Sequence, residues 1–477
     1  MAEMFIGGKD VTFDGLDRIE VIDPGRGIVV GDAPAGGPDQ VDHAVRAATD
    51  AFQSWRRVPA AKRGELLLAA ANAVADHIDE LAPILTAEQG KPLREARLEL
   101  NKFVHTLDHY AGLARNLRGQ SVPDLDEGTR GIVLKRPLGV VGAIVPWNFP
   151  TTLLGNKLGP ALICGNTIVA KPDETTPLTT LRVAQIMHAA GIPDGVFNVV
   201  TGRGDVAGAA LAAHPGVAKV AFTGSTPVGK LIMKSAADRM ARVTLELGGS
   251  DPMLILADGD VDKAISAASM GRFFNCGQAC LAIKRVYAEA SVYDHVVESI
   301  AAKAAKLSLG LGDVKGTQIG PLHSARGRDD ISRQLADGVA SGGEIVAGGG
   351  IPDDDALADG FFHQPTVVAN PAHDSALATE ETFGPVLPIW PVADLEEAVS
   401  RANASPFGLG SSVWTSDLRK ATYAMEHIDA GYTWINSPTK VYDELPFGGL
   451  KESGYGKEHG IEVLDYYQEM KSVVIRD

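Results

Sequence analysis

Two residues with reactive side chains, a cysteine and a glutamate, stand in glycine-containing segments of this sequence. Cys280 ends the run FFNCGQAC at residues 273–280, and Glu246 opens the run ELGG, 34 residues before the cysteine. A cysteine thiolate can attack a carbonyl carbon, and a carboxylate can activate the water that releases the resulting acyl group. The pair therefore predicts catalysis through a covalent acyl intermediate.

A third segment could donate a hydrogen bond in such a reaction. Asn148 lies in the run PWNFP at residues 146–150, and its side-chain amide could donate to the oxyanion that forms when a thiolate adds to a carbonyl. Each feature alone has an ordinary explanation. A lone cysteine is often structural, a lone glutamate is usually a surface charge, and an asparagine between prolines is a common turn residue.

Two further turns have features of a nucleotide site. The run FTGSTPVGK at residues 222–230 follows a predicted strand and opens a predicted helix, so its backbone N–H groups could approach a phosphate. It is not the usual G-x-G-x-x-G fingerprint, and a tight turn in any α/β protein has similar features. Glu174 follows another predicted strand, where a carboxylate can accept hydrogen bonds from ribose hydroxyls; the alternative is a solvated loop charge.

The elements that must position these residues are helices alternating with short apolar strands. Apolar residues at three- and four-residue spacing predict amphipathic helices at 39–58, 62–85 and 92–116. After residue 138, strands are predicted at 140–145, 167–170, 197–200 and 219–222, with helices at 151–164 and 178–190. A second series has strands at 253–256 and 285–288 and helices at 261–274, 292–305 and 421–429. This alternation predicts a parallel sheet covered on both faces.

Two later segments differ from this pattern. Residues 341–360 are rich in glycine and aspartate and predict an exposed loop or hairpin. Residues 471–475 predict an edge strand that no helix follows. Because an uncovered terminal strand often pairs with another chain, this segment predicts self-association.

Composition restricts the class of protein. The 477 residues suffice for two or three domains, and 45% hydrophobic with 22% charged residues is typical of a globular protein. The formal net charge of −16 disfavours nucleic acid and anionic membranes as partners. Cys164, Cys276 and Cys280 are the three cysteines, too few for a disulfide framework and without zinc-finger spacing, so no metal is expected. Without a recognisable signal peptide or long apolar run, a cytoplasmic protein is expected.

Seven motifs stand in an order and spacing that resemble the NAD(P)-dependent aldehyde dehydrogenase superfamily of the hydrolytic, non-CoA-acylating type. They are PWNFP at 146–150, Lys171, GST at 224–226, ELGG at 246–249, GQAC at 277–280, ETFGP at 381–385 and PFGGLKESG at 446–454. The resemblance covers essentially the whole chain. It implies an α/β fold with a Rossmann-type dinucleotide-binding domain, an α/β catalytic domain and a small β bridging element that makes a homodimer or homotetramer.

The resemblance and the order of elements together predict three parts. The NAD-binding domain is expected at residues 1–118 and 136–245. The catalytic domain, which contains the nucleophilic cysteine, is expected at 246–442. The bridging and oligomerisation element, with the C-terminal segment, is expected at 119–135 and 443–477.

The resemblance also implies a role for each catalytic residue. Cys280 would add to an aldehyde, and the Asn148 side chain and the Cys280 backbone N–H would hold the oxyanion. Hydride transfer to the cofactor would leave a thioester, and Glu246 would activate the water that hydrolyses it. Because CoA-acylating relatives typically lack this glutamate, its presence favours release of a free carboxylic acid.

Cofactor and substrate contacts are implied in the same way. The residues expected to bind the cofactor are Val145, Pro146, Trp147, Lys171, Glu174, Phe222, Gly224, Ser225, Gly229, Leu247, Gly248, Glu381 and Phe383. Glu174 favours NAD over NADP, since a carboxylate repels a 2′-phosphate. The residues expected to line the substrate pocket are Phe149, Leu153, Asn156, Ala279, Leu281 and Phe447. The two phenylalanines favour an apolar or aromatic aldehyde, and Asn156, at a position often aromatic in the family, indicates a roomier or more polar channel.

Several alternatives stay open on the sequence. Asp443 and Glu444 could attract a cationic aldehyde, although solvated loop charges are the preferred interpretation. Cys276 could form a reversible disulfide with Cys280 or be a small buried residue. The chain could be a non-catalytic binding protein on the same fold, or a cysteine hydrolase. The hydrolase would require a partner histidine, for which the 12 histidines give no local signature.

Overall fold

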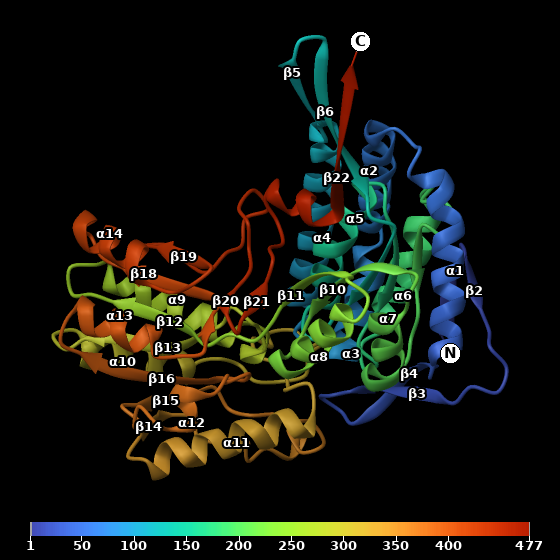
Figure 1. Cartoon of the computed structure of the whole chain (residues 1–477). Coiled ribbons are helices and arrows are strands. Elements are labelled where there is room, and N and C mark those ends of the chain that lie inside the picture. The colour runs from blue at the N-terminus through green and yellow to red at the C-terminus, as the bar shows by residue number, and fades with distance from the viewer. Residues whose placement is uncertain (1, 477) are drawn as a thin grey trace.

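The computed structural model describes residues 2–476, which form two large sheets and a projecting arm (Figure 1). The first sheet has the strand order β2-β1-β9-β8-β7-β10-β11-β21. Its strands are β1 (Met4–Ile6), β2 (Lys9–Val11), β7 (Val140–Ile144), β8 (Thr167–Lys171), β9 (Phe197–Val199), β10 (Val217–Thr223), β11 (Arg242–Glu246) and β21 (Gly454–Tyr455). Strands β7 to β11 run parallel. Short apolar sequences predicted β7 to β10, whereas β11 was not predicted.

Helices cover both faces of the first sheet. Successive strand residues point to opposite sides, so each strand contributes side chains to both apolar layers. On β7, Val141 and Ala143 pack with α2 (Ala60–Asp76), α3 (Ile78–Gln89), α4 (Leu93–Leu113), α5 (Pro150–Ile163) and α6 (Leu178–Ala189). Val140 and Ile144 pack on the other face with α1 (Pro38–Trp55), α7 (Ala209–Ala213) and α8 (Thr226–Ala237). The two apolar layers hold the strand ends, and hence the loops after them, in fixed positions.

The helix predicted at 62–85 is two helices, which corrects the sequence interpretation. The chain leaves the helical conformation at His77, with φ −108° and ψ 10°, between α2 and α3. The His77 ring bonds to the Ala73 carbonyl over 2.7 Å and occupies the end of α2. The apolar spacing continues across this turn, so the pattern alone predicted one helix.

The second sheet has the order β14-β15-β16-β13-β12-β18-β19 and is parallel except for β14. Its strands are β12 (Asp251–Ile255), β13 (Ile283–Glu289), β14 (Glu344–Ala347), β15 (Thr366–Ala369), β16 (Val386–Val392), β18 (Gly410–Trp414) and β19 (Tyr432–Ile435). Helices α9 (Val261–Phe273), α10 (Tyr293–Ala304) and α11 (Ala325–Ala340) cover one face. Helices α13 (Leu395–Asn403) and α14 (Leu418–His427) cover the other, and α12 (Ala376–Thr379) is a short turn beside α11.

Two small pairs of strands complete the fold. The hairpin of β3 (Arg18–Asp23) and β4 (Ile28–Pro34) packs against α3 and α6, while β17 (Phe407–Gly408) pairs with β20 (Leu450–Lys451). None of the helices in residues 2–476 has the length and apolar character needed to cross a bilayer.

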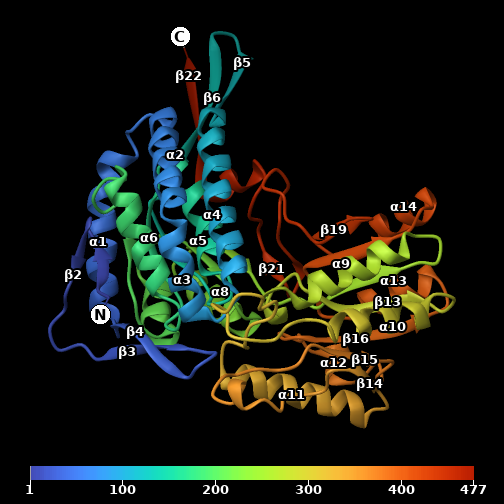
Figure 2. The ribbon, with the colours of Figure 1, turned by 180° about the vertical axis from the view of Figure 1, so that it is seen from behind.

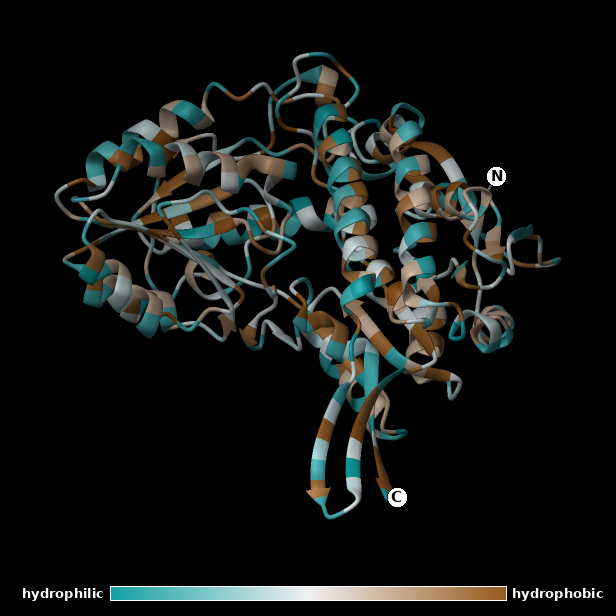
Figure 3. Cartoon of the chain, turned by 90° about the horizontal axis from the view of Figure 1, so that it is seen from above, coloured by the Kyte–Doolittle hydropathy of each residue, from teal (hydrophilic) through white to brown (hydrophobic). Residues whose placement is uncertain are grey.

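The arm is a three-stranded antiparallel sheet of β5 (Gln120–Asp126), β6 (Thr129–Pro137) and β22 (Gln468–Arg476), with β6 in the middle. Figure 2, seen from behind, shows the arm extending beyond the first half of the molecule. Apolar positions recur along its strands in Figure 3, and Met470 and Val474 are 76% and 67% exposed. The predicted terminal edge strand is therefore present, and it presents apolar side chains to solvent.

The strands cross two of the expected domain boundaries. β6 continues to Pro137, beyond the boundary expected after residue 135. β21, expected in the bridging element, instead pairs with β11 at the edge of the first sheet. Backbone hydrogen bonding determines where β6 ends and which sheet β21 joins, and the residue types do not reveal it.

Candidate active site

The candidate base stands at the C-terminal edge of the first sheet. Glu246 is the last residue of β11 and lies opposite Thr223, the last residue of β10. Parallel strands bring their carboxyl ends to one edge, where α/β proteins form their ligand sites. The loops that carry Asn148 and Lys171 leave the same edge at the ends of β7 and β8.

The Glu246 carboxyl is buried without a compensating charge contact. The residue is 3% exposed, and neither side-chain oxygen accepts a hydrogen bond of ordinary geometry within residues 2–476. Burial and the charge of Glu458 raise its pKa to about 8, while Lys157 and the Cys280 thiol act in the opposite direction. Such a carboxyl is largely protonated at neutral pH and becomes a stronger base than an exposed one.

A buried ion pair lies behind Glu246. The Lys157 ammonium donates to Glu458 Oε1 over 2.7 Å and to Thr223 Oγ1 over 2.6 Å. The Asn156 side chain donates to Glu458 Oε2 over 2.9 Å. Asn156, expected in the substrate pocket, is thus held by this ion pair. Sequence reasoning missed Lys157 and Glu458, although a lysine inside the apolar helix α5 was a signal for a buried partner.

The chain turns sharply just before the candidate nucleophile. Asn275, Cys276 and Gly277 have φ of 50°, 55° and 74°, which is the left-handed region. This conformation costs about 1–2 kcal/mol for each residue with a side chain. At Gly277 a Cβ would lie 2.3 Å from the Gly384 carbonyl oxygen, so no larger residue fits. Cys276 is 2% exposed and packs in the core of the second half.

Residues of both halves stabilise this turn. The Asn275 N–H donates to Glu95 Oε2 over 2.9 Å, and the Asn275 side chain donates to the Asn148 carbonyl over 3.1 Å. The Gln278 N–H closes the turn on the Asn275 carbonyl over 3.0 Å. The turn is therefore fixed to α4 and to the loop that carries the candidate oxyanion donor.

Asn148 reaches the nucleophile segment from the first half. Its side-chain amide donates to the Gln278 carbonyl over 3.0 Å, two residues before Cys280. Its backbone carbonyl accepts from the Lys91 ammonium over 2.7 Å. Lys91 forms a buried ion pair with Glu99, which in turn accepts from the Thr151 N–H over 2.9 Å. The loop at 146–150 is consequently held at both ends.

Cys280 is partly exposed at this junction. Burial and the charge of Glu246 raise the pKa of its thiol well above the usual value, and Lys284 acts in the opposite direction. The Lys284 ammonium donates to the Cys280 carbonyl over 2.6 Å and to the Gly249 carbonyl over 2.7 Å, so the nucleophile segment lies beside the segment that Glu246 opens. The structure thus brings together the three residues that the sequence singled out as catalytic.

A cleft of about 710 Å³ opens along the same edge of the first sheet. Eight of the residues expected to bind the cofactor line it: Val145, Pro146, Trp147, Lys171, Glu174, Phe222, Gly224 and Ser225. Ser225 directly precedes α8, whose first N–H groups are suited to a phosphate. The volume is in the range typical of cofactor sites.

The charges at the end of β8 suit a ribose. The Lys171 ammonium donates to Glu174 Oε2 over 3.0 Å. Burial alone would raise the pKa of Glu174, but the charge of Lys171 and hydrogen bonds from Lys171 and from backbone N–H groups together lower it. Glu174 is therefore an ionised acceptor within the cleft.

The remaining residues expected at the cofactor lie beside the cleft rather than in its lining. Gly229 allows α8 to approach Leu247, because a Cβ there would lie 2.5 Å from the leucine side chain. A Cβ on Gly248 would lie 2.5 Å from Glu381 Oε2. The Phe383 ring stands edge-on to Trp147 at 5.7 Å between ring centroids. These contacts place Glu381 and Phe383 where the two halves meet.

Aromatic rings surround the expected substrate pocket. Phe149 stacks on Phe274, with ring centroids 6.1 Å apart, and sequence reasoning had not selected Phe274. Phe447 is buried and packs against Tyr432 and His459. The other expected residues are Leu153 and Ala279, which are buried, and Leu281, which is partly exposed.

The preferred interpretation of Asp443 as a solvated charge is wrong. It is 1% exposed, and its carboxylate contacts Lys102 over 2.7 Å, His105 over 2.7 Å and His459 over 2.9 Å. Burial would raise its pKa, but His459 and Lys102 outweigh that effect and the pKa is lowered. Lys102 and the two histidine rings already occupy this carboxylate, whereas Glu444 is exposed as expected.

Comparison with known proteins gives matches along nearly the whole chain. Residues 11–473 match the Aldehyde dehydrogenase family. The chain is 40% identical to the phenylacetaldehyde dehydrogenase of Pseudomonas fluorescens, covering 99% of this chain and 95% of that protein. A solved NADP-dependent enzyme of Escherichia coli is 35% identical with a TM-score of 0.97, covering 100% and 98% of the two chains.

A second solved structure shows the other nicotinamide cofactor. It is betaine aldehyde dehydrogenase from Staphylococcus aureus in complex with NAD+, 34% identical with a TM-score of 0.96, covering 99% of this chain and 94% of that one. These likenesses confirm the expected fold.

Proposed function

Since the chain belongs to the aldehyde dehydrogenase family, we propose that it uses NAD to oxidise an aldehyde to a free carboxylic acid, with Cys280 as nucleophile and Glu246 as base. The observation that carries this proposal is the pairing at the junction of the halves. The segment of a partly exposed thiol is joined through Lys284 to the segment that follows Glu246. The Glu246 carboxyl is buried, accepts no hydrogen bond of ordinary geometry from the described residues, and has a pKa raised to about 8. An unsatisfied buried carboxyl is costly in a purely structural role, and it suits a base that must take up a proton.

In the first half-reaction the Cys280 sulfur bonds to the aldehyde carbon. The thiol proton passes to ionised Glu246, and the carbonyl electron pair moves to oxygen. The Asn148 amide and the Cys280 backbone N–H donate to that oxyanion. Removal of one such donor typically costs about 3–4 kcal/mol of transition-state stabilisation.

The cleft residues fit a nicotinamide dinucleotide. Lys171 and Glu174 would hold the adenosine ribose, the start of α8 at Ser225 the pyrophosphate, and Glu381 and Phe383 the nicotinamide end. When bound, this cofactor accepts the hydride that leaves the substrate carbon. Glu174 would face a 2′-phosphate with its negative charge, which supports NAD over NADP.

Deacylation then depends on Glu246. Once Glu246 has released the first proton to solvent, its carboxylate takes a proton from a water molecule whose oxygen attacks the thioester carbon. The C–S bond breaks, the electron pair of that bond stays on the Cys280 sulfur, and the acid is released. The glutamate supports hydrolysis over transfer to CoA, because water is small enough to be activated beside a buried carboxyl.

We further infer an apolar or aromatic substrate. The stacked Phe149 and Phe274 rings and buried Phe447 favour such a group. The relative named phenylacetaldehyde dehydrogenase supports this class. We also assign the first half to cofactor binding, the second half to the nucleophile, and the arm to contact with another copy of the chain.

The test is NADH formation with aliphatic, aromatic, amino- and carboxy-aldehydes, with NAD and NADP side by side and no CoA. Cys280→Ala should abolish turnover while NAD binding persists, and full activity in that variant would refute the mechanism. The cysteine-hydrolase alternative predicts ester turnover that needs a histidine but no NAD. Weak esterase activity alone does not separate the two, since an activated thiol can hydrolyse activated esters.

A further inference from the structure

A buried lysine beneath the nucleophile joins three segments of the candidate active site. Lys284, on β13, is 0% exposed. Its ammonium donates to the Cys280 carbonyl over 2.6 Å, to the Gly249 carbonyl over 2.7 Å and to Glu381 Oε1 over 2.8 Å. These acceptors belong to the nucleophile segment, to the segment after Glu246, and to the loop expected at the nicotinamide ribose. All three lysine N–H groups are thus used.

The same ammonium sits among negative charges that face the nucleophile. Glu246 from β11, Asp251 from β12 and Glu381 from the loop before β16 each disfavour the thiolate of Cys280, and Lys284 favours it. Glu381 also accepts from the Gly249 N–H over 3.0 Å, so its carboxylate is fixed between backbone and ammonium. A charged donor makes a stronger hydrogen bond than a neutral one. Lys284 therefore both holds these segments in place and offsets the negative charge around Cys280.

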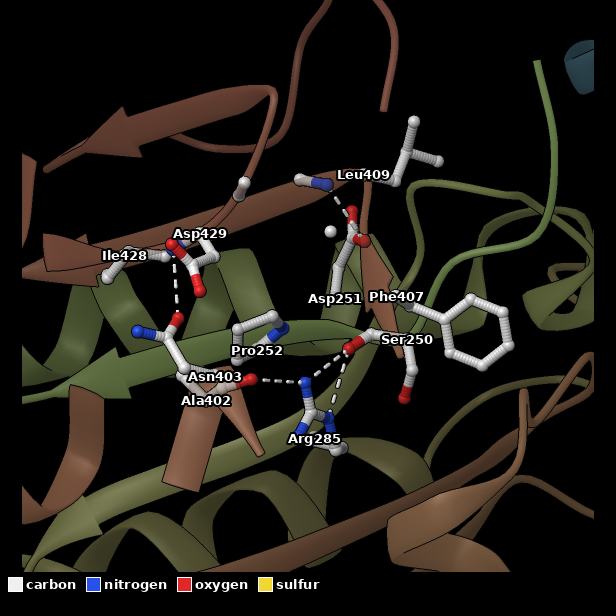
Figure 4. Close-up of a pocket in the computed structure, with 13 residues that line it drawn as sticks. Ser250, Asp251, Pro252, Arg285, Ala402, Asn403, Phe407, Leu409, Ile428 and Asp429 are labelled. Carbon is white, nitrogen blue, oxygen red and sulfur yellow. Dashed lines mark hydrogen bonds between the residues drawn. The ribbon is translucent and has the colours of Figure 1, made fainter. Parts of the chain in front are cut away.

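The next residue provides a natural contrast. Arg285 is also buried but points to the opposite side of β13, as strand geometry requires. Figure 4 shows its guanidinium bonded to the Ser250 and Ala402 carbonyls; the distances are 2.8 Å and 3.0 Å. Arg285 thus satisfies backbone carbonyls as Lys284 does, without a contact to Cys280 or Glu381.

We propose that Lys284 is a positioning residue that fixes Cys280 and Glu381 relative to the segment after Glu246 and holds its positive charge next to the nucleophile segment. The proposal rests on the proposed function, in which Cys280 is the nucleophile and Glu381 contacts the cofactor. The proposed function does not in turn require Lys284, because Cys280 could oxidise an aldehyde with another residue holding these segments in place. Loss of the lysine should impair both the thiol and the cofactor end of the site.

The test compares Lys284→Met with Arg285→Met in the full-length protein. The first readout is the rate of Cys280 alkylation by iodoacetamide across pH, with the modified residue identified by mass spectrometry. Lys284→Met should raise the midpoint of the pH profile by about one unit or more, which is about a tenfold slower reaction at pH below the midpoint. NAD affinity, measured by fluorescence titration, should fall about tenfold. Arg285→Met should lose thermal stability but keep both values.

Lys284→Arg keeps the positive charge and should retain the wild-type midpoint. If Lys284→Met does not fold, the neutral Lys284→Gln replaces it with the same expectation. An unchanged alkylation midpoint together with unchanged NAD affinity would overturn the proposal, as would equal shifts in Arg285→Met. Failure of the proposed function has a different signature, namely full turnover in Cys280→Ala.

Discussion

The raised pKa of Glu246 predicts how acyl-enzyme hydrolysis depends on pH. Only the ionised carboxyl can accept a proton from water, and its pKa is about 8. At pH 7 about one carboxyl in eleven is ionised, and at pH 9 about ten in eleven. Where deacylation limits turnover, the steady-state rate should therefore rise about tenfold between these pH values and then level off.

Rapid mixing of enzyme with aldehyde and NAD separates the two half-reactions. The initial burst of NADH reports acylation, and the slower phase that follows reports deacylation. Glu246→Gln should keep a burst, although a slower one because the thiol proton must then pass to water. It should slow the later phase by about a hundredfold or more, which is the usual contribution of a positioned base. The variant's slow phase should also lose its rise with pH.

Two results would contradict this reasoning. A wild-type slow phase that is flat from pH 7 to 9 would mean that the base titrates elsewhere, and a Gln variant that keeps the wild-type pH dependence would mean that Glu246 is not the base. Asn148→Ala serves as the control, because it should slow the reaction by weaker oxyanion binding without moving the pH midpoint.

Three further outcomes are expected. Glu174→Gln should improve NADP binding relative to NAD by about tenfold, since it removes a charge that repels the 2′-phosphate; unchanged titrations with both cofactors would refute the role. Asp443→Asn should cost about 1–3 kcal/mol of unfolding free energy in a denaturant titration, because Lys102, His105 and His459 lose a buried carboxylate partner, whereas Glu444→Gln on the surface should not. Deletion of residues 468–477 should give a smaller species in sedimentation, and an unaltered mass would show that the arm does not mediate association.

The regular part of the fold was predictable because its sequence signals are local. The apolar strands β7 to β10 and the helices between them follow short-range patterns. Helix α11 was not predicted, because charged and small residues dominate it and its few buried apolar residues include Ile331 and Leu335. The break at His77 was not predicted either, since the apolar spacing continues unchanged across the single turn at which the helix ends.

The candidate site residues that stand in sequence motifs could be predicted. Those that are recognised only by their buried partners could not. Cys280, Glu246 and Asn148 stand in runs that identify them without a structure. Lys157 is a single charge in an apolar segment, and Lys284 stands next to Arg285 in another. The partners of the two lysines lie 301 and 97 residues away in the chain. Only the folded arrangement shows that each is paired. The left-handed backbone at Cys276 is also unexpected, because that residue type rarely adopts it.

The order in which the ribosome delivers the chain has a consequence for Glu246. Its strand, β11, is the last parallel strand of the first sheet, and its outer edge pairs only with β21 at residues 454–455. The Leu247 N–H donates to the Ser453 carbonyl over 3.0 Å, so this hydrogen bond also cannot form until residue 453 has been made. A nascent chain therefore carries its base on an open sheet edge until more than two hundred further residues are made, a period in which such an edge invites pairing with other chains. The open edge beside the base is covered only after residues 454–455 have been made.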